Sequence, residues 1–110
     1  MAVKLLVHPA FCRRVRHYRD RLALHDGRPQ IAARFAEAAR DLVLRLLQNP
    51  QCGHSARFES PDLADILRAS LPGFPVFALF YRWDGQRLTV LTLEHTAQDL
   101  PSRLAGLVSD

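Results

Sequence analysis

Residues 76–95 read VFALFYRWDGQRLTVLTLEH and carry the strongest structural signal of the chain. Two apolar runs, 76–83 and 87–93, stand on either side of the pair Asp84-Gly85. Such a pair favours the tight turn of a β-hairpin, because glycine readily adopts the positive φ that the turn requires. Both runs have apolar residues on both faces of the strand, so both faces of the two strands should be buried. We therefore expect these strands at the centre of a sheet, with helices covering one side.

The first of these strands is unusually rich in aromatic residues. Successive side chains of a strand point to opposite faces. Tyr81 and Trp83 should therefore share one face, and Phe80 and Arg82 the other. We expect one pair to face the helices and the other pair to face a less covered side.

Upstream of this hairpin the apolar spacing is that of helices. Residues 3–7 form a short apolar run that Pro9 stops, which predicts an opening strand. A helix is then predicted over residues 10–24 by four apolar side chains at helical spacing. They are Phe11, Val15, Tyr18 and Leu22.

A second helix should follow the turn at Asp26-Gly27. Pro29 suits its first turn, and Asn49-Pro50 ends it. Its apolar stripe consists of Ile31, Phe35, Ala38, Leu42 and Leu46. Two antiparallel helices joined by a short turn form a helix hairpin.

The remaining segments complete an α+β fold. Residues 51–61 should be a loop, and residues 63–71 fit either a helical turn or a strand, of which we favour the strand. Thr96, with Asp99 three residues later, can cap a last helix with a buried stripe. That stripe consists of Leu100, Leu104 and Leu107. We expect an N-terminal strand, a helix hairpin packed on a mostly antiparallel four-stranded sheet and a C-terminal helix, in one domain over residues 1–110.

The charge of the chain is concentrated in its first half. Residues 1–45 hold ten Lys or Arg against four Asp or Glu, whereas residues 46–110 hold five against seven. A basic surface on a small domain indicates an anionic partner, such as nucleic acid or an acidic protein segment. No apolar run is long enough to span a membrane, and residues 1–7 lack the features of a signal peptide. We therefore expect a cytoplasmic protein with no membrane partner.

The cysteines and histidines do not indicate a metal site. Cys12 and Cys52 match no metal-ligand spacing, and we expect both to be free thiols. His8, His17, His25 and His54 show no i, i+4 pairing with one another or with a carboxylate. We expect neither a metal nor a cofactor.

Six short motifs follow one another between Pro50 and Leu100. They are Pro50-Gln51-Cys52-Gly53, Pro61-Asp62-Leu63, Phe74-Pro75, Phe80-Tyr81-Arg82, Asp84-Gly85, and the stretch from Leu93-Glu94-His95 to Asp99-Leu100. Each motif alone is common. In this order, after a helix hairpin, they resemble the ParE/RelE toxin superfamily of type II toxin–antitoxin systems, and the ParE-like branch in particular.

The resemblance implies a biological role as well as a fold. It implies a toxin that acts in plasmid stabilisation or stress response and is neutralised by a cognate ParD-like antitoxin. Such antitoxins typically wrap an extended, partly acidic segment around the toxin and fold as they bind. ParE-like members resemble inhibitors of DNA gyrase that act by binding, which would make any contact with nucleic acid indirect.

The RelE-like branch supplies the main alternative, a ribosome-dependent mRNA endonuclease. Its members commonly carry an Arg in the aromatic strand, at the position that Ala78 occupies here. Catalysis would then depend on His95, Arg82 and Tyr81, and a base without a nearby cation stabilises the phosphate transition state poorly. The missing Arg favours a binding toxin over an enzyme. Gln98 stands where the ParE pattern usually has Arg, which leaves a non-toxic family member as a third alternative.

Several polar residues are candidates for a target- or antitoxin-binding surface. They are Arg13, Arg14, Arg16, Arg68, Arg82 and His95. Five arginines within residues 13–21 favour a partner over a merely solvated helix face. His95 could instead be a structural group that caps the next turn with Thr96 and Asp99, and Arg82 could make a cross-strand pair. We expect Leu42→Asp to unfold the domain, and Arg14→Glu to leave folding intact while weakening the antitoxin complex.

Overall fold

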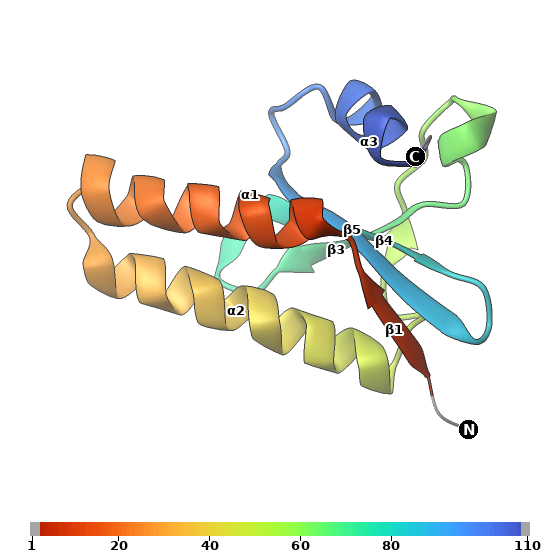
Figure 1. Ribbon diagram of the computed structural model, residues 1–110, viewed down its shortest axis with the longest axis horizontal. Coiled ribbons are helices and arrows are strands. Elements are labelled where there is room, and N and C mark those ends of the chain that lie inside the picture. Colours follow the sequence, from red (N-terminus) through yellow and green to blue (C-terminus); the bar gives the residue numbers. More distant parts are fainter. Residues whose placement is uncertain (1–2, 109–110) are drawn as a thin grey trace.

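The structure, a computed structural model, describes residues 3–108 and shows a helix hairpin and a C-terminal helix around one sheet (Figure 1). Residues 1, 2, 109 and 110 of the predicted domain lie outside the described residues. The elements in chain order are β1 (Lys4–Val7), α1 (Pro9–Asp20), the π-helical turn η1 (Arg21–His25), α2 (Pro29–Gln48), β2 (His54–Ser55), the 3-10 turn η2 (Pro61–Leu63), β3 (Leu67–Leu71), β4 (Phe74–Trp83), β5 (Arg87–His95) and α3 (Leu100–Val108).

The predicted hairpin of β4 and β5 is confirmed and lies inside the sheet. The strands are antiparallel, with Leu79 opposite Leu93. In the connecting turn Gly85 has a φ of +97°. The Asp84 carboxylate accepts the backbone N–H groups of Gln86 and Arg87 at 2.9 and 2.6 Å. These two hydrogen bonds stabilise the turn. They are also the main reason that the pKa of Asp84 lies below its ordinary value, because they favour the charged carboxylate.

The sheet is mixed and five-stranded, where a mostly antiparallel four-stranded sheet was expected. Its strand order is β1-β5-β4-β3-β2. β1 runs parallel to β5, with Val7 opposite Val90, and the two-residue β2 adds a fifth strand beside β3. A four-residue apolar run carries no information about its direction, and a two-residue strand has no periodicity. In the segment 63–71 the favoured strand is confirmed as β3, and the 3-10 turn η2 ends at the first residue of that segment, Leu63.

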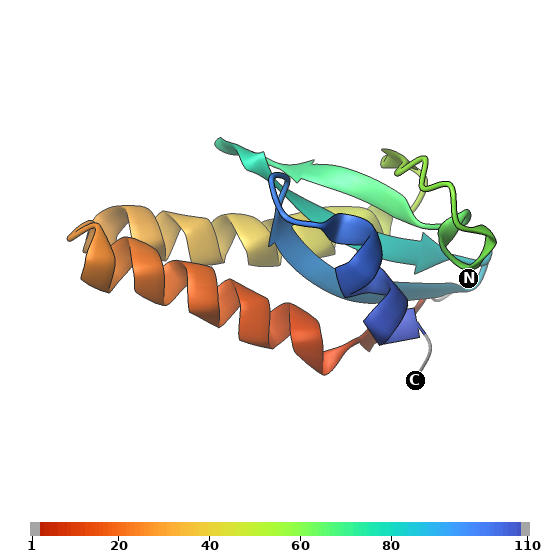
Figure 2. The same cartoon turned by 90° about the horizontal axis from the view of Figure 1, so that it is seen from above.

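The two predicted helices are confirmed and lie side by side over one face of the sheet (Figure 1). The ring of His8 accepts the Ala10 N–H at 3.0 Å and so caps the start of α1. At its other end α1 continues as η1, and Gly27, with a φ of +61°, turns the chain into α2. The tip of this hairpin projects well beyond the strands, as Figures 1 and 2 show from two sides.

Two apolar clusters cover the two faces of the sheet. On the hairpin face the fully buried side chains include Phe35, Leu46, Leu79, Tyr81, Val90 and Leu93. On the other face, Leu100 and Leu104 of α3 pack with Leu63 and Ile66 against β4 and β5. The predicted alternation in β4 is confirmed, since Tyr81 and Trp83 face the hairpin. The second face is not poorly covered, however, because Phe80 there is 0% exposed.

The last helix begins directly after Asp99, whose carboxylate accepts the Ser102 hydroxyl at 2.8 Å. Thr96 lies in the turn after β5, where its backbone N–H donates to the Val76 carbonyl of β4 at 2.8 Å, and within residues 3–108 no side-chain hydrogen bond from Thr96 caps α3. Leu100 and Leu104 are buried as predicted, and Leu107 packs at the edge of the same cluster.

Candidate functional site

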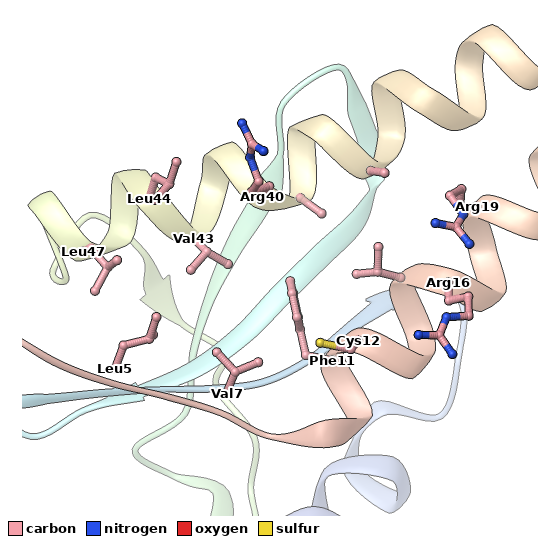
Figure 3. A pocket seen from close by; sticks show the side chains of 13 residues that line it. Leu5, Val7, Phe11, Cys12, Arg16, Arg19, Arg40, Val43, Leu44 and Leu47 are labelled. Carbon is pink, nitrogen blue, oxygen red and sulfur yellow. The ribbon is translucent and has the colours of Figure 1, made fainter.

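An apolar groove lies between β1, α1 and α2, on the outer side of the hairpin (Figure 3). Its volume is about 360 Å³. Its apolar lining comes from Leu5 and Val7 of β1, Phe11 and Val15 of α1, and Val43, Leu44 and Leu47 of α2. Leu44 is 49% exposed, so these side chains are left open to a partner rather than filled from within.

The groove becomes basic toward the hairpin tip. Arg16 and Arg19 of α1 and Arg40 of α2 belong to its lining, and in Figure 3 the two α1 arginines lie at the opposite end from Leu5 and Leu47. Among these three, Arg19 has an ion pair, an exposed one with its neighbour Asp20 at 3.3 Å. The groove therefore combines an apolar floor with positive charge at one end.

β1 is an edge strand, and its free edge adjoins the groove. The sheet order ends at β1, and Leu5, Leu6 and Val7 are 40%, 49% and 40% exposed. An edge strand presents backbone N–H and C=O groups to which an extended segment can add as a further strand. No sequence pattern was interpreted as this surface, although Leu44 and Leu47 stand outside the buried stripe of α2 and could have indicated it.

The arginines of α1, predicted as one surface, fall into separate sets. Arg16 lines the groove, and Arg13 is exposed. Arg14 instead makes an intramolecular ion pair: its Nε donates to both carboxylate oxygens of Glu94 at 3.1 Å, and its guanidinium lies 4.8 Å from the centre of the Tyr18 ring. Arg14 is therefore engaged within the fold.

Glu94 is the centre of a buried polar cluster that no sequence pattern indicated. Its side chain is 3% exposed. Besides Arg14, it accepts the hydroxyls of Tyr18 at 3.1 Å and Thr92 at 2.7 Å. Arg103 of α3 approaches to 3.8 Å, so the carboxylate connects α1, β5 and α3. The structure therefore contradicts the expectation that Arg14→Glu leaves folding intact, because it would place two carboxylates together in a buried site.

His95 contributes to the turn after β5. Its Nδ1 accepts the Ala97 N–H at 3.0 Å, and its ring packs edge-on against Phe77 at 5.2 Å. This is the structural alternative that the sequence left open, although the partner is Ala97 rather than Thr96 or Asp99.

Tyr81, Arg82 and Arg68 are each engaged within the fold. The hydroxyl of Tyr81 donates to the Pro50 carbonyl at 2.9 Å and accepts the Gly53 N–H at 3.0 Å. Burial raises the pKa of Tyr81 above its usual 10.0. Arg82 makes an ion pair with Asp65 at 3.1 Å, and because Asp65 lies in the turn between η2 and β3 this is not the cross-strand pair that the sequence suggested. The guanidinium of Arg68 lies 5.9 Å from the centre of the Phe80 ring.

The three residues that a ribonuclease would need do not meet in one site. Tyr81 faces the hairpin, and its strand neighbour Arg82 points to the opposite face. His95 lies opposite Phe77, four residues along β4 from Tyr81, which corresponds to about 13 Å of strand. His95, Arg82 and Tyr81 are thus not brought together around a common point.

Residues 3–108 offer no candidate metal site. Within that range, no three side chains of His, Cys, Asp or Glu gather as they would around a metal ion. None of the helices in the described part of the chain is long and apolar enough to cross a membrane. Cys12 and Cys52 are both exposed free thiols, as the sequence analysis expected.

Comparisons with known proteins agree with this architecture. No curated protein matches the sequence. One similar solved structure is described as the chromosomal ParDE TA system from P. aeruginosa, with a TM-score of 0.68 and 17% identity over 86% of this chain and 96% of that one. Another is a YoeB/ParE toxin from Agrobacterium tumefaciens, with a TM-score of 0.56 and 19% identity over 84% of this chain and 98% of that one. At these identities the likeness concerns the fold.

The sequence itself carries the family assignment. The family model described as the ParE toxin of the type II toxin-antitoxin system parDE matches residues 5–100. The chain therefore belongs to the ParE toxin family.

Proposed function

We propose that this chain inhibits bacterial growth by binding DNA gyrase, without cutting a bond, and that a ParD-like antitoxin neutralises it. Gyrase as the target comes from the ParE-like resemblance, to which the family match at residues 5–100 gives weight. The observation that carries the choice of binding over catalysis is the separation of His95, Arg82 and Tyr81, each of which has a partner within the fold.

The buried positions of the aromatic strand also support a binding toxin. Ala78 is 0% exposed and lies under α3, where a ribonuclease of this superfamily would present a cation. General acid–base cleavage of RNA needs a base within hydrogen-bond reach of the attacking hydroxyl and a cation at the phosphate. Ala78 supplies no such cation, and the two arginines near its strand partner Glu94, Arg14 and Arg103, are held by that carboxylate, which supports binding over cleavage.

The groove and the free edge of β1 suit an antitoxin of defined chemistry. Apolar residues of a docked segment would contact Leu5, Val43 and Leu44, and its carboxylates would meet the arginines at the other end of the groove. An adjoining extended stretch would add to β1 through backbone hydrogen bonds. We therefore propose an acidic, amphipathic partner segment that folds on binding.

Controlled expression in a bacterial host tests the target. We expect growth arrest with filamentation, relaxed plasmid DNA and intact transcripts, because a gyrase inhibitor removes negative supercoiling first. Plasmid topology and transcript integrity are measured from the same cultures, with the unfolded variant Leu42→Asp as the control for expression burden. Rapid loss of translation with cut transcripts would assign the chain to the ribonuclease alternative, and normal growth would make it a non-toxic member.

A further inference from the structure

Helix α1 and the π-helical turn η1 that continues it carry a second row of basic side chains on the side away from the groove. Arg14, His17 and Arg21 recur at spacings of three and four residues, which places them on one side of the helix. Arg16 and Arg19 belong to the groove side. The two rows therefore lie on opposite flanks of the same helix.

Arg103 of α3 brings a further guanidinium to this second row. It lies 3.8 Å from Glu94, which Arg14 already binds, and donates to the side-chain oxygen of Gln98 at 2.9 Å. Two arginines thus share one buried carboxylate, so positive charge is left in excess. We call the set His17, Arg21 and Arg103 the α1–α3 patch. Burial lowers the pKa of His17, and the charges of Arg14, Arg21 and Arg103 lower it further, as expected where these cations lie close together.

A cavity of about 340 Å³ opens beside the patch, between the hairpin and the end of β5. Arg21, His95 and Gln98 line it, and each can offer a hydrogen-bond donor. Asp26 is the one carboxylate in its lining. The cavity has the donors and the room that a phosphate group needs.

We propose that the α1–α3 patch binds the phosphate backbone of duplex DNA. Arginine forks capture phosphate oxygens in pairs, and phosphate contacts require positive charge and donors rather than shape complementarity to one sequence. The seven residue steps from Arg14 to Arg21 correspond to about 10 Å of helix, the length over which one DNA strand presents about three phosphates. This binding goes beyond the proposed contact with gyrase and requires no gyrase.

The apolar residues around the patch argue against the other kinds of partner. Protein interfaces have an apolar core, yet the open apolar side chains of α1 line the groove. Leu24, which is 80% exposed, is the one apolar side chain in a further pocket beside His17 and Arg21, and a single leucine does not make an apolar core. Proteins that bind single strands stack bases on exposed aromatic rings, whereas Tyr18 and Phe77 beside the patch are buried.

Fluorescence anisotropy with a labelled mixed-sequence DNA duplex and the purified full chain tests this. Binding should weaken between about 50 and 200 mM salt, with a logarithmic slope of about −2 to −3 for two or three phosphate contacts. Arg21→Gln with Arg103→Gln should reduce the steepness of that slope by about 2. The matched control, Arg16→Gln with Arg19→Gln, loses the same charge from the groove side and should keep the wild-type slope.

Three results would overturn the proposal: no binding of the duplex at low salt, equal losses in the two double variants, or tighter binding of a single strand of the same length. Equal losses would mean that only net charge matters. Thermal melting followed by circular dichroism verifies folding, because Arg103 also contacts Glu94. Should the double variant unfold, Arg21→Gln alone decides the matter, with an expected reduction of about 1 in slope.

Discussion

The two flanks of α1 differ in how they meet the rest of the protein. Toward β5 and α3, Arg14 and Tyr18 close on Glu94, and among the described residues no buried side-chain polar atom is left without a partner. Toward β1 and α2, Phe11 and Val15 line a groove that no part of the described chain fills. We call the hydrogen-bonded cluster of Arg14, Tyr18 and Glu94 on the first flank the closed joint. The other flank is an open apolar surface.

Residues on the flank toward β5 and α3 maintain the fold, whereas residues in the groove are open to contact a partner. A buried polar group is costly unless it is hydrogen-bonded, so the closed joint is sensitive to any change that removes one member. The groove side chains are already exposed to water in the free protein, so substitutions there should alter partner binding more than the free energy of unfolding.

The largest contrast is expected between two leucines of α2. Leu42 is 3% exposed and packs in the core, whereas Leu44 is 49% exposed and lines the groove. Leu42→Asp buries an unpaired charge and should cost more than about 4 kcal/mol, enough to prevent folding. Leu44→Asp should change the free energy of unfolding by less than about 0.5 kcal/mol. Urea unfolding followed by circular dichroism measures both.

The same pair tests the function of the groove. Leu44→Asp should stay folded but no longer bind the product of the neighbouring antitoxin reading frame, as measured by calorimetry with the wild-type toxin as reference. Undiminished affinity would remove the groove from the interface, and an unfolded Leu44→Asp would show that the groove is part of the core.

The closed joint should respond in the opposite way. Glu94→Gln leaves the Arg14 guanidinium, with a side chain 21% exposed, without its counter-ion and should cost about 3 kcal/mol of stability. The double variant Arg14→Met with Glu94→Leu should recover most of that loss, because it removes both charges together. If the single variant were as stable as the wild type in urea, the cluster would not be a stabilising joint.

The parts of the fold that could be predicted are those with a local signal. The β4–β5 hairpin follows from its Asp84-Gly85 turn, and the buried stripe of α2 follows from the spacing of Phe35, Leu42 and Leu46. Each of these patterns is complete within a few residues. Helical and strand periods are properties of the chain itself, so they survive without knowledge of the neighbours.

The joint and the groove could not be predicted in the same way. Arg14 and Glu94 are 80 residues apart, and on the sequence alone Arg14 is one of several arginines of a solvated face. The groove depends on β1 lying beside the hairpin, which requires the parallel pairing with β5. Both features arise from packing between segments that are distant in the sequence, and neither residue spacing nor composition indicates which distant segments will pack together.

A second tightly packed contact depends on Gly53, whose backbone N–H donates to the Tyr81 hydroxyl at 3.0 Å. A Cβ at this position would overlap the hydroxyl of Tyr81 and lie 2.8 Å from the Arg68 carbonyl oxygen, which is backbone and cannot move freely. Gly53→Ala should therefore cost about 2 kcal/mol through overpacking. Gly106→Ala is the control, because no atom lies within 4 Å of its added Cβ and alanine favours the helix. Equal melting temperatures for the two variants would show that the packing around Gly53 tolerates a Cβ.

The smallest predicted effect concerns Tyr81 and pH. Tyr81→Phe leaves the Pro50 carbonyl and the Gly53 N–H without their partner and should cost about 1 kcal/mol at neutral pH. Burial raises the pKa of Tyr81 in the folded protein above 10.0, so the unfolded chain loses this proton first as the pH rises. The stability contributed by the neutral phenol is thus present below pH 10.0 and is lost from there up to the raised pKa. Urea unfolding at a series of alkaline pH values should show the gap between wild type and Tyr81→Phe narrowing above that pH, whereas a constant gap would mean that the buried phenol does not titrate with unfolding.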